Sequence, residues 1–341
     1  MKTATLLAAL SVLAGALAAP LAGDSALHRR SLPRLGGVNL AGCDFGIDIY
    51  GNSGTPACPG TEQVGHFIAD GANLFRLPAG WQYLVGNNQA STSLAPDFFA
   101  QYDALVQAVI SKGAYAIIDV HNYARWNGAI IGQGGPSNQD FANLWTLLAT
   151  KVTSNDPNVI FGLMNEPHDL DVSTWAGSVQ AAVNAIRAAG ATSQYILIPG
   201  TGFTNANAWF QGQDNALLGV TDPVGGTDKL LLDVHRYNDV DFSGTHAECT
   251  TNSLDVLSSL DSWLKGNGRK AIVSETGGGH TTSCETDLGE FLNGIKEDYP
   301  SVLGFAVWAA GSFDPSYVLS ITPTNGVDNQ LFDIAVKPNL P

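Results

Sequence analysis

The chain has 341 residues, 45% of them hydrophobic, and a formal net charge of −15. This length allows one large α/β domain or two smaller ones, and the apolar content is sufficient for a full core. The acidic balance argues against nucleic acid and against an anionic membrane surface as partners, because both are bound through clustered Lys and Arg.

The first residues are typical of a targeting segment rather than of a fold. A lysine, an apolar run and a small-residue site predict a signal peptide over residues 1–18. The dibasic pair Arg29-Arg30 predicts a propeptide over residues 19–30, which leaves residues 31–341 as one mature domain. No later run in the sequence is long and apolar enough to cross a bilayer, so we expect a secreted, extracellular protein.

Eight short apolar segments, each bounded by turn residues, predict eight buried strands. Nearly continuous apolar runs of this length suit parallel strands that are covered on both faces. The segments are residues 37–40, 73–78, 115–120, 159–164, 195–199, 230–234, 270–274 and 302–308.

Helix-like stretches, with apolar residues at i, i+3 and i+4, lie between most of these strands. The clearest cover residues 97–111, 141–152, 174–188 and 254–265, whereas the helix after the fifth strand is interrupted by Gly and Asn. An unbroken alternation of strand and helix, joined by right-handed crossovers, favours a single closed (β/α)₈ TIM barrel over an open doubly wound sheet.

Four cysteines are consistent with export. Cys43 and Cys58 flank a Gly-rich segment, and Cys249 and Cys284 lie in polar loops, so we predict two local disulfides. Four free thiols are the alternative. A metal site made of cysteines is not supported, because the sequence contains no Cys-x-x-Cys pair. No phosphate-binding glycine motif opens a helix, so the sequence also gives no support for a nucleotide, and we expect no cofactor.

Polar and aromatic side chains follow the predicted strands. In a barrel of βα units all eight carboxyl ends meet at one mouth, where ligands bind. Pro167, which lacks an N–H, ends the fourth strand and leaves polar residues just before it. The full set at the mouth is Arg76, His121, Asn122, Tyr123, Asn165, Glu166, His168, His235, Tyr237, Glu275 and Trp308. Such a set suits a neutral polar ligand with flat apolar faces, such as a sugar.

Glu166 and Glu275 are the two glutamates of this set. A lone glutamate after a strand could be a structural acid paired with Arg or a helix N-terminus, whereas two at equivalent positions favour catalysis. Strands four and seven face each other across the mouth, so at a separation of about 5 Å one acid could attack the anomeric carbon while the other protonates the leaving oxygen. Arg76 is placed to keep Glu275 ionised, and His235 and Tyr237 to orient the pair.

Seven segments, in this order, resemble fungal endo-β-1,4-glucanases of glycoside hydrolase family 5. They are FRLPAGWQYLV, IIDVHNYARWNGAIIGQGGP, GLMNEPHD, DVHRY, SGTHAECTTN, SETGGG and WAAGSFDPSYVL, and the similarity covers nearly all of residues 36–320. The resemblance implies a secreted, retaining cellulase that hydrolyses internal β-1,4 bonds of cellulose and related β-glucans. We expect a β-glucan or cello-oligosaccharide as the partner, no metal, and a monomer.

The resemblance also implies roles for matching residues. Glu166, in MNEP, is similar to the family's acid/base, and Glu275, in SETGGG, to its nucleophile. Asn165 resembles the residue that hydrogen-bonds the sugar 2-hydroxyl. The remaining matches are supporting or substrate-binding positions: Arg76, His121, Asn122, His235, Tyr237, Trp126 and the aromatic platform Trp308.

One segment departs from the family pattern. Fungal relatives carry Trp shortly after strand five, in a Pro-Gly-Asn-x-Trp sequence, where this chain has Phe203 in Pro-Gly-Thr-Gly-Phe. A smaller ring stacks on less sugar surface. We therefore expect either a weaker leaving-side subsite at Phe203 or substitution of its role by Trp209.

Tryptophans outside that segment divide by their position along the chain. Those inside helix-like stretches, Trp145, Trp175 and Trp263, are expected to pack against the barrel. Those that follow strands, Trp81, Trp126 and Trp308, are expected to serve as sugar platforms.

Two other interpretations compete with the cellulase. The triplets Asp119-Val120-His121 and Asp233-Val234-His235 could hold metal in an amidohydrolase-type barrel, but such a site also needs a strand-end Lys or more His, so we expect these Asp residues to accept hydrogen bonds beneath the mouth. On the same scaffold a β-mannanase, an exo-β-1,3-glucanase or a sugar-binding protein without catalysis remain alternatives.

Overall fold

The computed structural model describes residues 31–152 and 156–341, together with Met1. The chain divides into two units, Met1–Leu32 and Pro33–Pro341, and the second carries the fold. The predicted signal peptide and propeptide lie, apart from Met1, outside the described residues. Among the described helices none is both long and apolar enough to cross a membrane.

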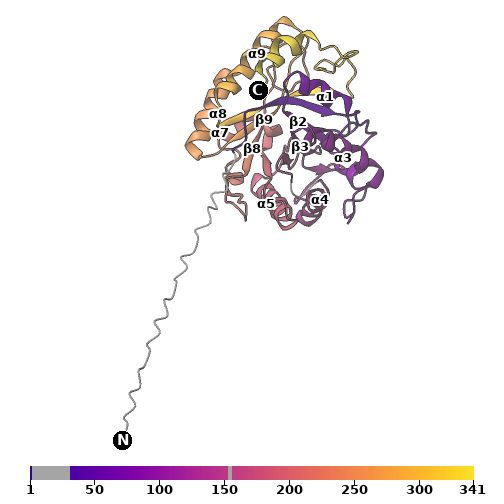
Figure 1. The fold of residues 1–341 in the computed structure, drawn as a ribbon, viewed down its shortest axis with the longest axis vertical. Coiled ribbons are helices and arrows are strands. Elements are labelled where there is room, and N and C mark those ends of the chain that lie inside the picture. The colour runs from indigo at the N-terminus through magenta and orange to yellow at the C-terminus, as the bar shows by residue number, and fades with distance from the viewer. Residues whose placement is uncertain (2–30, 153–155) are drawn as a thin grey trace. The chain divides into compact units, whose positions relative to one another are not determined.

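The second unit is built on a closed barrel of eight parallel strands (Figure 1). The apolar runs are buried on both faces because the barrel interior covers one side and helices cover the other. Around the barrel the order is β1 (Leu35–Ala41), β10 (Val302–Gly311), β9 (Ala271–Thr276), β8 (Leu230–His235), β7 (Tyr195–Pro199), β6 (Val159–Gly162), β3 (Tyr115–Val120) and β2 (Leu74–Ala79). The predicted TIM barrel and all eight strands are confirmed.

Observed strand ends differ from the prediction by up to three residues, and two of the differences concern the mouth. β6 stops at Gly162 rather than at residue 164, although Leu163 and Met164 stay buried. β10 continues to Gly311, beyond the predicted residue 308, because it pairs with β1 along that strand's whole length. Both differences lie at the carboxyl ends of the strands, which form the mouth.

Helices surround the barrel: α1 (Glu62–Ala69), α3 (Pro96–Ile110), α4 (Asn138–Lys151), α5 (Val172–Ala188), α8 (Leu254–Asn267) and α9 (Thr282–Glu297). The four predicted helices correspond to α3, α4, α5 and α8. Side-chain caps fix several N-termini, as in the capping box of Ser137 with Asp140 at α4. Trp145 and Trp175 are fully buried against the barrel, as expected, and the partly buried Trp263 packs beside Trp209.

The connection between β7 and β8 contains only short pieces, α6 (Thr201–Thr204), α7 (Ala206–Phe210) and the 3₁₀ turn η1 (Asn215–Gly219). Gly202 and Phe203 have left-handed φ angles of 61° and 63°, so a single helix cannot run through them. The interruption expected from the Gly and Asn content is therefore real.

Smaller elements complete the unit. The turn α2 (Trp81–Leu84) and the hairpin of β4 (Arg125–Trp126) and β5 (Ala129–Ile130) follow β2 and β3. At the opposite end of the barrel, the C-terminal turns η2 (Phe332–Val336) and η3 (Lys337–Asn339) lie against α9, where the Asn339 amide donates to the Gly289 carbonyl.

Both predicted disulfides are present. Cys43–Cys58 closes the loop after β1, and Cys249–Cys284 joins the loop after β8 to α9. All four cysteines are therefore paired.

Candidate active site

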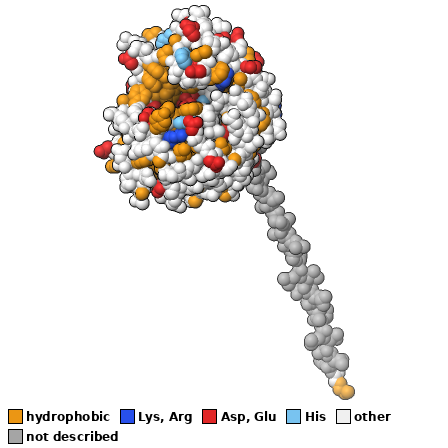
Figure 2. All heavy atoms as spheres, turned by 180° about the vertical axis from the view of Figure 1, so that it is seen from behind, with side chains coloured by type: hydrophobic (Ala, Val, Ile, Leu, Met, Phe, Trp, Pro, Cys, Tyr) orange, Lys and Arg blue, Asp and Glu red, His pale blue; other side chains and the backbone are white. Residues whose placement is uncertain are grey.

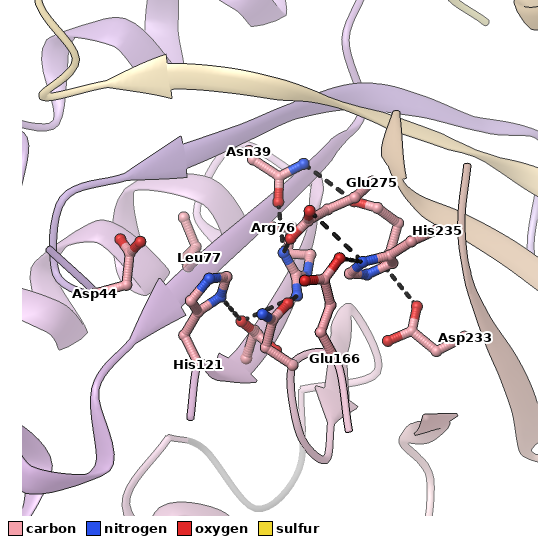
Figure 3. Close-up of polar contacts among 12 residues, drawn as sticks. Asn39, Asp44, Arg76, Leu77, His121, Glu166, Asp233, His235 and Glu275 are labelled. Carbon is pink, nitrogen blue, oxygen red and sulfur yellow. Dashed lines mark hydrogen bonds and ion pairs between the residues drawn. The ribbon is translucent and has the colours of Figure 1, made fainter. Parts of the chain in front are cut away.

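The two glutamates lie on opposite sides of the barrel mouth and point toward each other (Figure 3). Glu275 is part of β9, whereas Glu166 follows β6 on a bend with φ 41°. His235, from the end of β8, lies between them: its Nδ1 is 2.8 Å from Glu166 Oε1 and 3.5 Å from Glu275 Oε2. An oxygen of each glutamate and this nitrogen all lie within 4.8 Å of one another. Retaining glycosidases hold their carboxyl groups about 5–5.5 Å apart, and inverting ones farther, so the spacing suits retention.

Glu275 is held as a carboxylate. Its side chain is 5% exposed, with Arg76 Nη1 2.5 Å from Oε1 and the Tyr237 hydroxyl donating to Oε2 over 2.9 Å. Burial by itself would raise the pKa of Glu275, but the positive charges of His235 and Arg76 outweigh it and lower the pKa to about 2. The group is thus ionised at any ordinary working pH.

Arg76 organises the floor of the site. It is fully buried on β2 and contacts four side chains from four different strands or strand ends. Besides Glu275, it donates to Asn39 Oδ1 over 2.9 Å and to Asn165 Oδ1 over 2.7 Å, and it lies 3.1 Å from Asp119 Oδ2. The Asn165 Nδ2 group is buried and has no hydrogen-bond partner in the described part of the chain. It is therefore available to a ligand.

The contacts of His235 determine how many protons His235 and Glu166 hold between them. Ser274 Oγ donates to the Asp233 carboxylate over 2.5 Å, so it accepts from His235 Nε2–H over 3.0 Å. Nδ1 then faces Glu166, and one proton must lie between them, on Glu166 as an acid or on His235 as an imidazolium. Burial disfavours the charged ring, but Glu275 and Glu166 outweigh this and raise the pKa of His235. The site therefore carries one transferable proton beside the more exposed glutamate, whose side chain is 18% exposed.

The two D-x-H triplets support this floor and do not form a metal centre. Asp119 accepts from His121 Nδ1 over 2.9 Å and pairs with Arg76, while Asp233 accepts from Ser274. The His121 ring lies nearly parallel to Trp308, with centroids 5.5 Å apart. Of the Asp and His residues in the two triplets, only His235 belongs to a group of potential metal ligands among the described residues, and that group contains neither Asp119 nor Asp233. The amidohydrolase interpretation thus has no structural support.

The predicted tryptophan platforms divide into three cases. Trp308 is 9% exposed at the mouth, where its indole N–H donates to the Tyr317 hydroxyl. Trp126 is half-buried, with its ring edge-on to Trp81. Trp81 itself is fully buried, so its predicted role as a platform is wrong. It follows a strand but turns inward at the start of α2.

Asn122 and Trp209 are also buried beneath the surface of the mouth. Asn122 is fully buried; it accepts from the Trp81 backbone N–H and donates to Gln82, so it supports α2 rather than contacting substrate. Trp209 is fully buried and donates to the Asp233 carbonyl, so it cannot replace Phe203. Phe203 remains 40% exposed, with one ring face stacked on His168.

The three glycines after Glu275 are required by close approach. A Cβ at Gly277 would lie 2.6 Å from the Trp308 carbonyl oxygen, one at Gly278 2.7 Å from Cys284 Sγ, and one at Gly279 2.3 Å from the Ala247 carbonyl oxygen. The chain that leaves β9 therefore passes between β10, a disulfide and the loop after β8. These contacts explain why three glycines follow Glu275 in SETGGG.

Three members of the site were not identified from the sequence. Asn39 donates to the carbonyls of Ser274 and Ala306 and accepts from Arg76, which joins four strands. The Ser274 hydroxyl accepts a hydrogen bond from His235 and donates one to Asp233. Asp44 is buried near His121, and burial raises the pKa of its carboxyl group. Only the positions of these residues near strand ends could have indicated them.

The mouth is open on one face. A hollow there is surrounded by hydrophobic side chains, with acidic and histidine side chains among them (Figure 2). A (β/α)₈ barrel with two facing carboxyl groups at retaining distance, one permanently ionised and one beside a shared proton, defines a retaining glycoside hydrolase.

Comparisons identify the family. The model for "Cellulase (glycosyl hydrolase family 5)" matches residues 38–311. The manganese dependent endoglucanase Eg5A of Phanerodontia chrysosporium is 51% identical over 317 residues, which cover 91% of this chain and 81% of that protein. The crystal structure of Cel5A (EG2) from Hypocrea jecorina has a TM-score of 0.86 and 46% identity, covering 90% and 99% of the two chains. A complex of XacCel5A with cellopentaose has a TM-score of 0.80 and 29% identity, covering 90% and 100%.

The chain belongs to the cellulase family, glycosyl hydrolase family 5. It is an endo-β-1,4-glucanase that acts with retention.

Proposed function

We propose that Glu275 is the nucleophile and Glu166 the general acid/base of a double displacement on β-1,4-glucan chains. The observation that carries this assignment is the difference between their surroundings. Glu275 is buried, paired with Arg76 and ionised, whereas Glu166 is more exposed and shares a proton with His235. A nucleophile must stay charged, and an acid must hold a proton that it can release.

The two steps follow from these positions. A Glu275 oxygen attacks the anomeric carbon, the glycosidic C–O bond breaks, and the proton held by Glu166 and His235 passes to the leaving oxygen. Glu166 then takes a proton from water, whose oxygen displaces Glu275 and restores the configuration. The free Nδ2 of Asn165 is available to the 2-hydroxyl, and Trp308 offers its ring to the sugar face.

The substrate is proposed to be cellulose or a cello-oligosaccharide. The cellopentaose bound by XacCel5A supports this class of ligand. The mouth suits it, because hydrophobic side chains surround a polar floor whose cation, Arg76, is already paired with acids. We also propose that the protein acts outside the cell as a monomer, after removal of residues 1–30; the two disulfides support an oxidising compartment.

The name of the Phanerodontia relative raises the question of manganese. In the central group, Glu166, His235 and Glu275 come close enough to bind a cation, but Glu275 already accepts from Arg76 and Tyr237, so a divalent ion does not fit there. We propose that the displacement itself needs no metal. Dialysis against EDTA should then leave kcat on cellotetraose unchanged, and a loss that Mn²⁺ restores would contradict the proposal.

A second group has donors that fit a divalent cation better. Asp239, Asp241 and His246 place two carboxylates and an imidazole nitrogen within 4.8 Å in the loop after β8. The group of His66, Asp70 and Asp328 has the same donor types, but Lys337 already pairs with both of its carboxylates. Asp239, Asp241 and His246 would therefore hold Mn²⁺ if it binds this chain, and none of them takes part in the displacement.

Two variants test the assignment. Glu275→Ala should lose nearly all turnover and regain it with azide, giving a glycosyl azide of inverted configuration. Glu166→Ala should keep activity mainly on aryl cellobiosides with good leaving groups, because these need no proton. An equal loss of activity on dinitrophenyl cellobioside and on cellotetraose would refute the role of Glu166. Side-by-side assays on carboxymethylcellulose, mannan and laminarin separate the glucanase from the mannanase and the β-1,3-glucanase.

A further inference from the structure

The segment that carries Glu166 has an unusual backbone conformation. Glu166 and Asp169 have left-handed φ angles of 41° and 45°. Side chains with a Cβ adopt this region rarely, and they stay there only where the surroundings fix them. Contacts beside the glutamate must therefore supply that restraint.

Most of these contacts involve His168, which lies between the two strained residues and is 3% exposed. Its carbonyl oxygen accepts from Arg125 Nη2 over 2.7 Å, and its ring Nε2 lies 2.9 Å from the Ile49 carbonyl oxygen. Its ring stacks on Phe203, with centroids 4.2 Å apart and an angle of 9°. Three loops of the mouth, those after β1, β3 and β7, thus meet the acid/base segment at this residue.

The partners of the ring determine its charge. Nδ1 lies 2.9 Å from Asp169 Oδ2, and Nε2 faces the Ile49 carbonyl. A carboxylate and a carbonyl can only accept, so both ring nitrogens must donate and the ring is an imidazolium. The hydrogen bond and positive charge of His168 lower the pKa of Asp169 in return.

Few other charged or titratable groups face this ring. Arg125 lies on its backbone side, Tyr123 is edge-on with its centroid 6.2 Å away, and Glu166 is two residues back. Phe203 covers one ring face with a neutral surface. The two hydrogen bonds with Asp169 and Ile49 are therefore the contacts that depend on the second proton.

We propose that His168, as an imidazolium, is a positioning residue for the general acid/base Glu166. This inference rests on the proposed role of Glu166. A ring without the second proton has only one N–H donor, so it loses its hydrogen bond to either Ile49 or Asp169. The bend that positions Glu166 is then less restrained. Reactions that need a proton on the leaving oxygen then slow, while reactions of good leaving groups do not.

The protonation state can be tested on the unaltered enzyme. In a sample with ¹⁵N-labelled histidine, long-range ¹H–¹⁵N spectra distinguish protonated from bare ring nitrogens, and the spectrum of His168→Gln assigns the signal. We expect both ring nitrogens of His168 to carry a proton in the folded enzyme, because both face acceptors. A single neutral tautomer overturns the proposal.

The positioning role has its own test. His168→Gln offers one donor group and cannot bridge Asp169 and Ile49 as the imidazolium does. We expect kcat/KM on cellotetraose to fall about tenfold or more, but on dinitrophenyl cellobioside less than about threefold, since a small displacement of a catalytic group is costly only where that group acts. KM should change little.

His66→Gln is the matched control. His66 also contacts carboxylates, 2.6 Å from Asp328 and 3.4 Å from Asp70, but it lies on α1, outside the mouth. Its variant should leave the ratio of the two substrates unchanged. An equal loss on both substrates in His168→Gln refutes the inference. If Glu166→Ala also shows no dependence on the leaving group, the proposed function fails instead, so the two failures are distinguishable.

Discussion

Tyr237→Phe removes one hydrogen bond from Glu275, the proposed nucleophile, and leaves its charged partners in place. The hydroxyl donates to Glu275 Oε2 over 2.9 Å, and both side chains are buried. The fall in the pKa of Glu275 from 4.5 to about 2 is equivalent to about 3.4 kcal/mol of preference for the carboxylate. Tyr237 contributes less to this than His235, Arg76 and His121. A hydrogen bond to a charged group contributes about 1.5 kcal/mol at the low end, which corresponds to roughly one pKa unit.

Two shifts follow from that magnitude. The pKa of Glu275 rises in the variant, so the acid limb of kcat/KM should move up by about one pH unit. The carboxylate is also a poorer leaving group from the glycosyl-enzyme, so the second step should slow about tenfold. Because the folded pKa lies below the unfolded one, ionised Glu275 stabilises the fold above about pH 4.5, and this contribution is lost as the pH falls toward 2. In Tyr237→Phe this stabilisation by ionised Glu275 is lost at higher pH.

Stopped-flow assays with dinitrophenyl cellobioside measure both effects. A burst of phenolate, followed by slow turnover, is expected in the variant once the second step limits the rate. Tyr102→Phe is the control, since that buried hydroxyl donates to the Leu77 carbonyl rather than to Glu275. An acid limb that stays in place, with kcat unchanged, would show that the hydroxyl does not stabilise the carboxylate.

Two further changes have calculable outcomes. Phe203→Trp should enlarge the exposed ring beside His168 and lower the KM for cellotetraose about two- to fivefold, equivalent to roughly 0.5–1 kcal/mol of stacking, and an unchanged KM would exclude Phe203 from the leaving-side subsite. Replacing Cys249 and Cys284 together by Ser should lower the free energy of unfolding by about 3–4 kcal/mol, because the bridge closes a loop of 35 residues. Urea denaturation measures this loss, and a change below about 1 kcal/mol would contradict the loop-closure estimate.

The barrel could be predicted from the sequence because each strand is specified by residues that are adjacent in the chain. Each strand is a short apolar run, and burial on both faces follows from that run alone. Strand ends were less predictable, as β6 and β10 show, since they depend on pairing with neighbours distant in sequence. The short pieces after β7 were foreseen only as an interruption, because the left-handed turn at Gly202 and Phe203 has no periodic signature.

The site, too, has residues that could be predicted from the sequence and residues that could not. Residues within strand-end motifs, such as Glu166 and Glu275, could be found because a polar residue after an apolar run stands out. The orientation of side chains could not be predicted: Trp81 and Trp308 were both expected at strand ends, yet one turns inward and the other lines the mouth. Asn39 was missed because it is a single amide whose partners lie 235 and 267 residues away.

The placement of the two glutamates explains why each suits a different task. Glu275 lies within β9, directly opposite His235 of β8, while Arg76 lies opposite Asn39 in the register of β2 with β1. Strand register thus fixes the charges around Glu275, and a carboxylate held this rigidly can attack one point without rearrangement of its partners. Glu166 lies beyond the end of its strand, on a bend restrained by side-chain contacts. A group there can serve the leaving oxygen in one step and water in the next, which is the movement that an acid/base needs and a nucleophile must avoid.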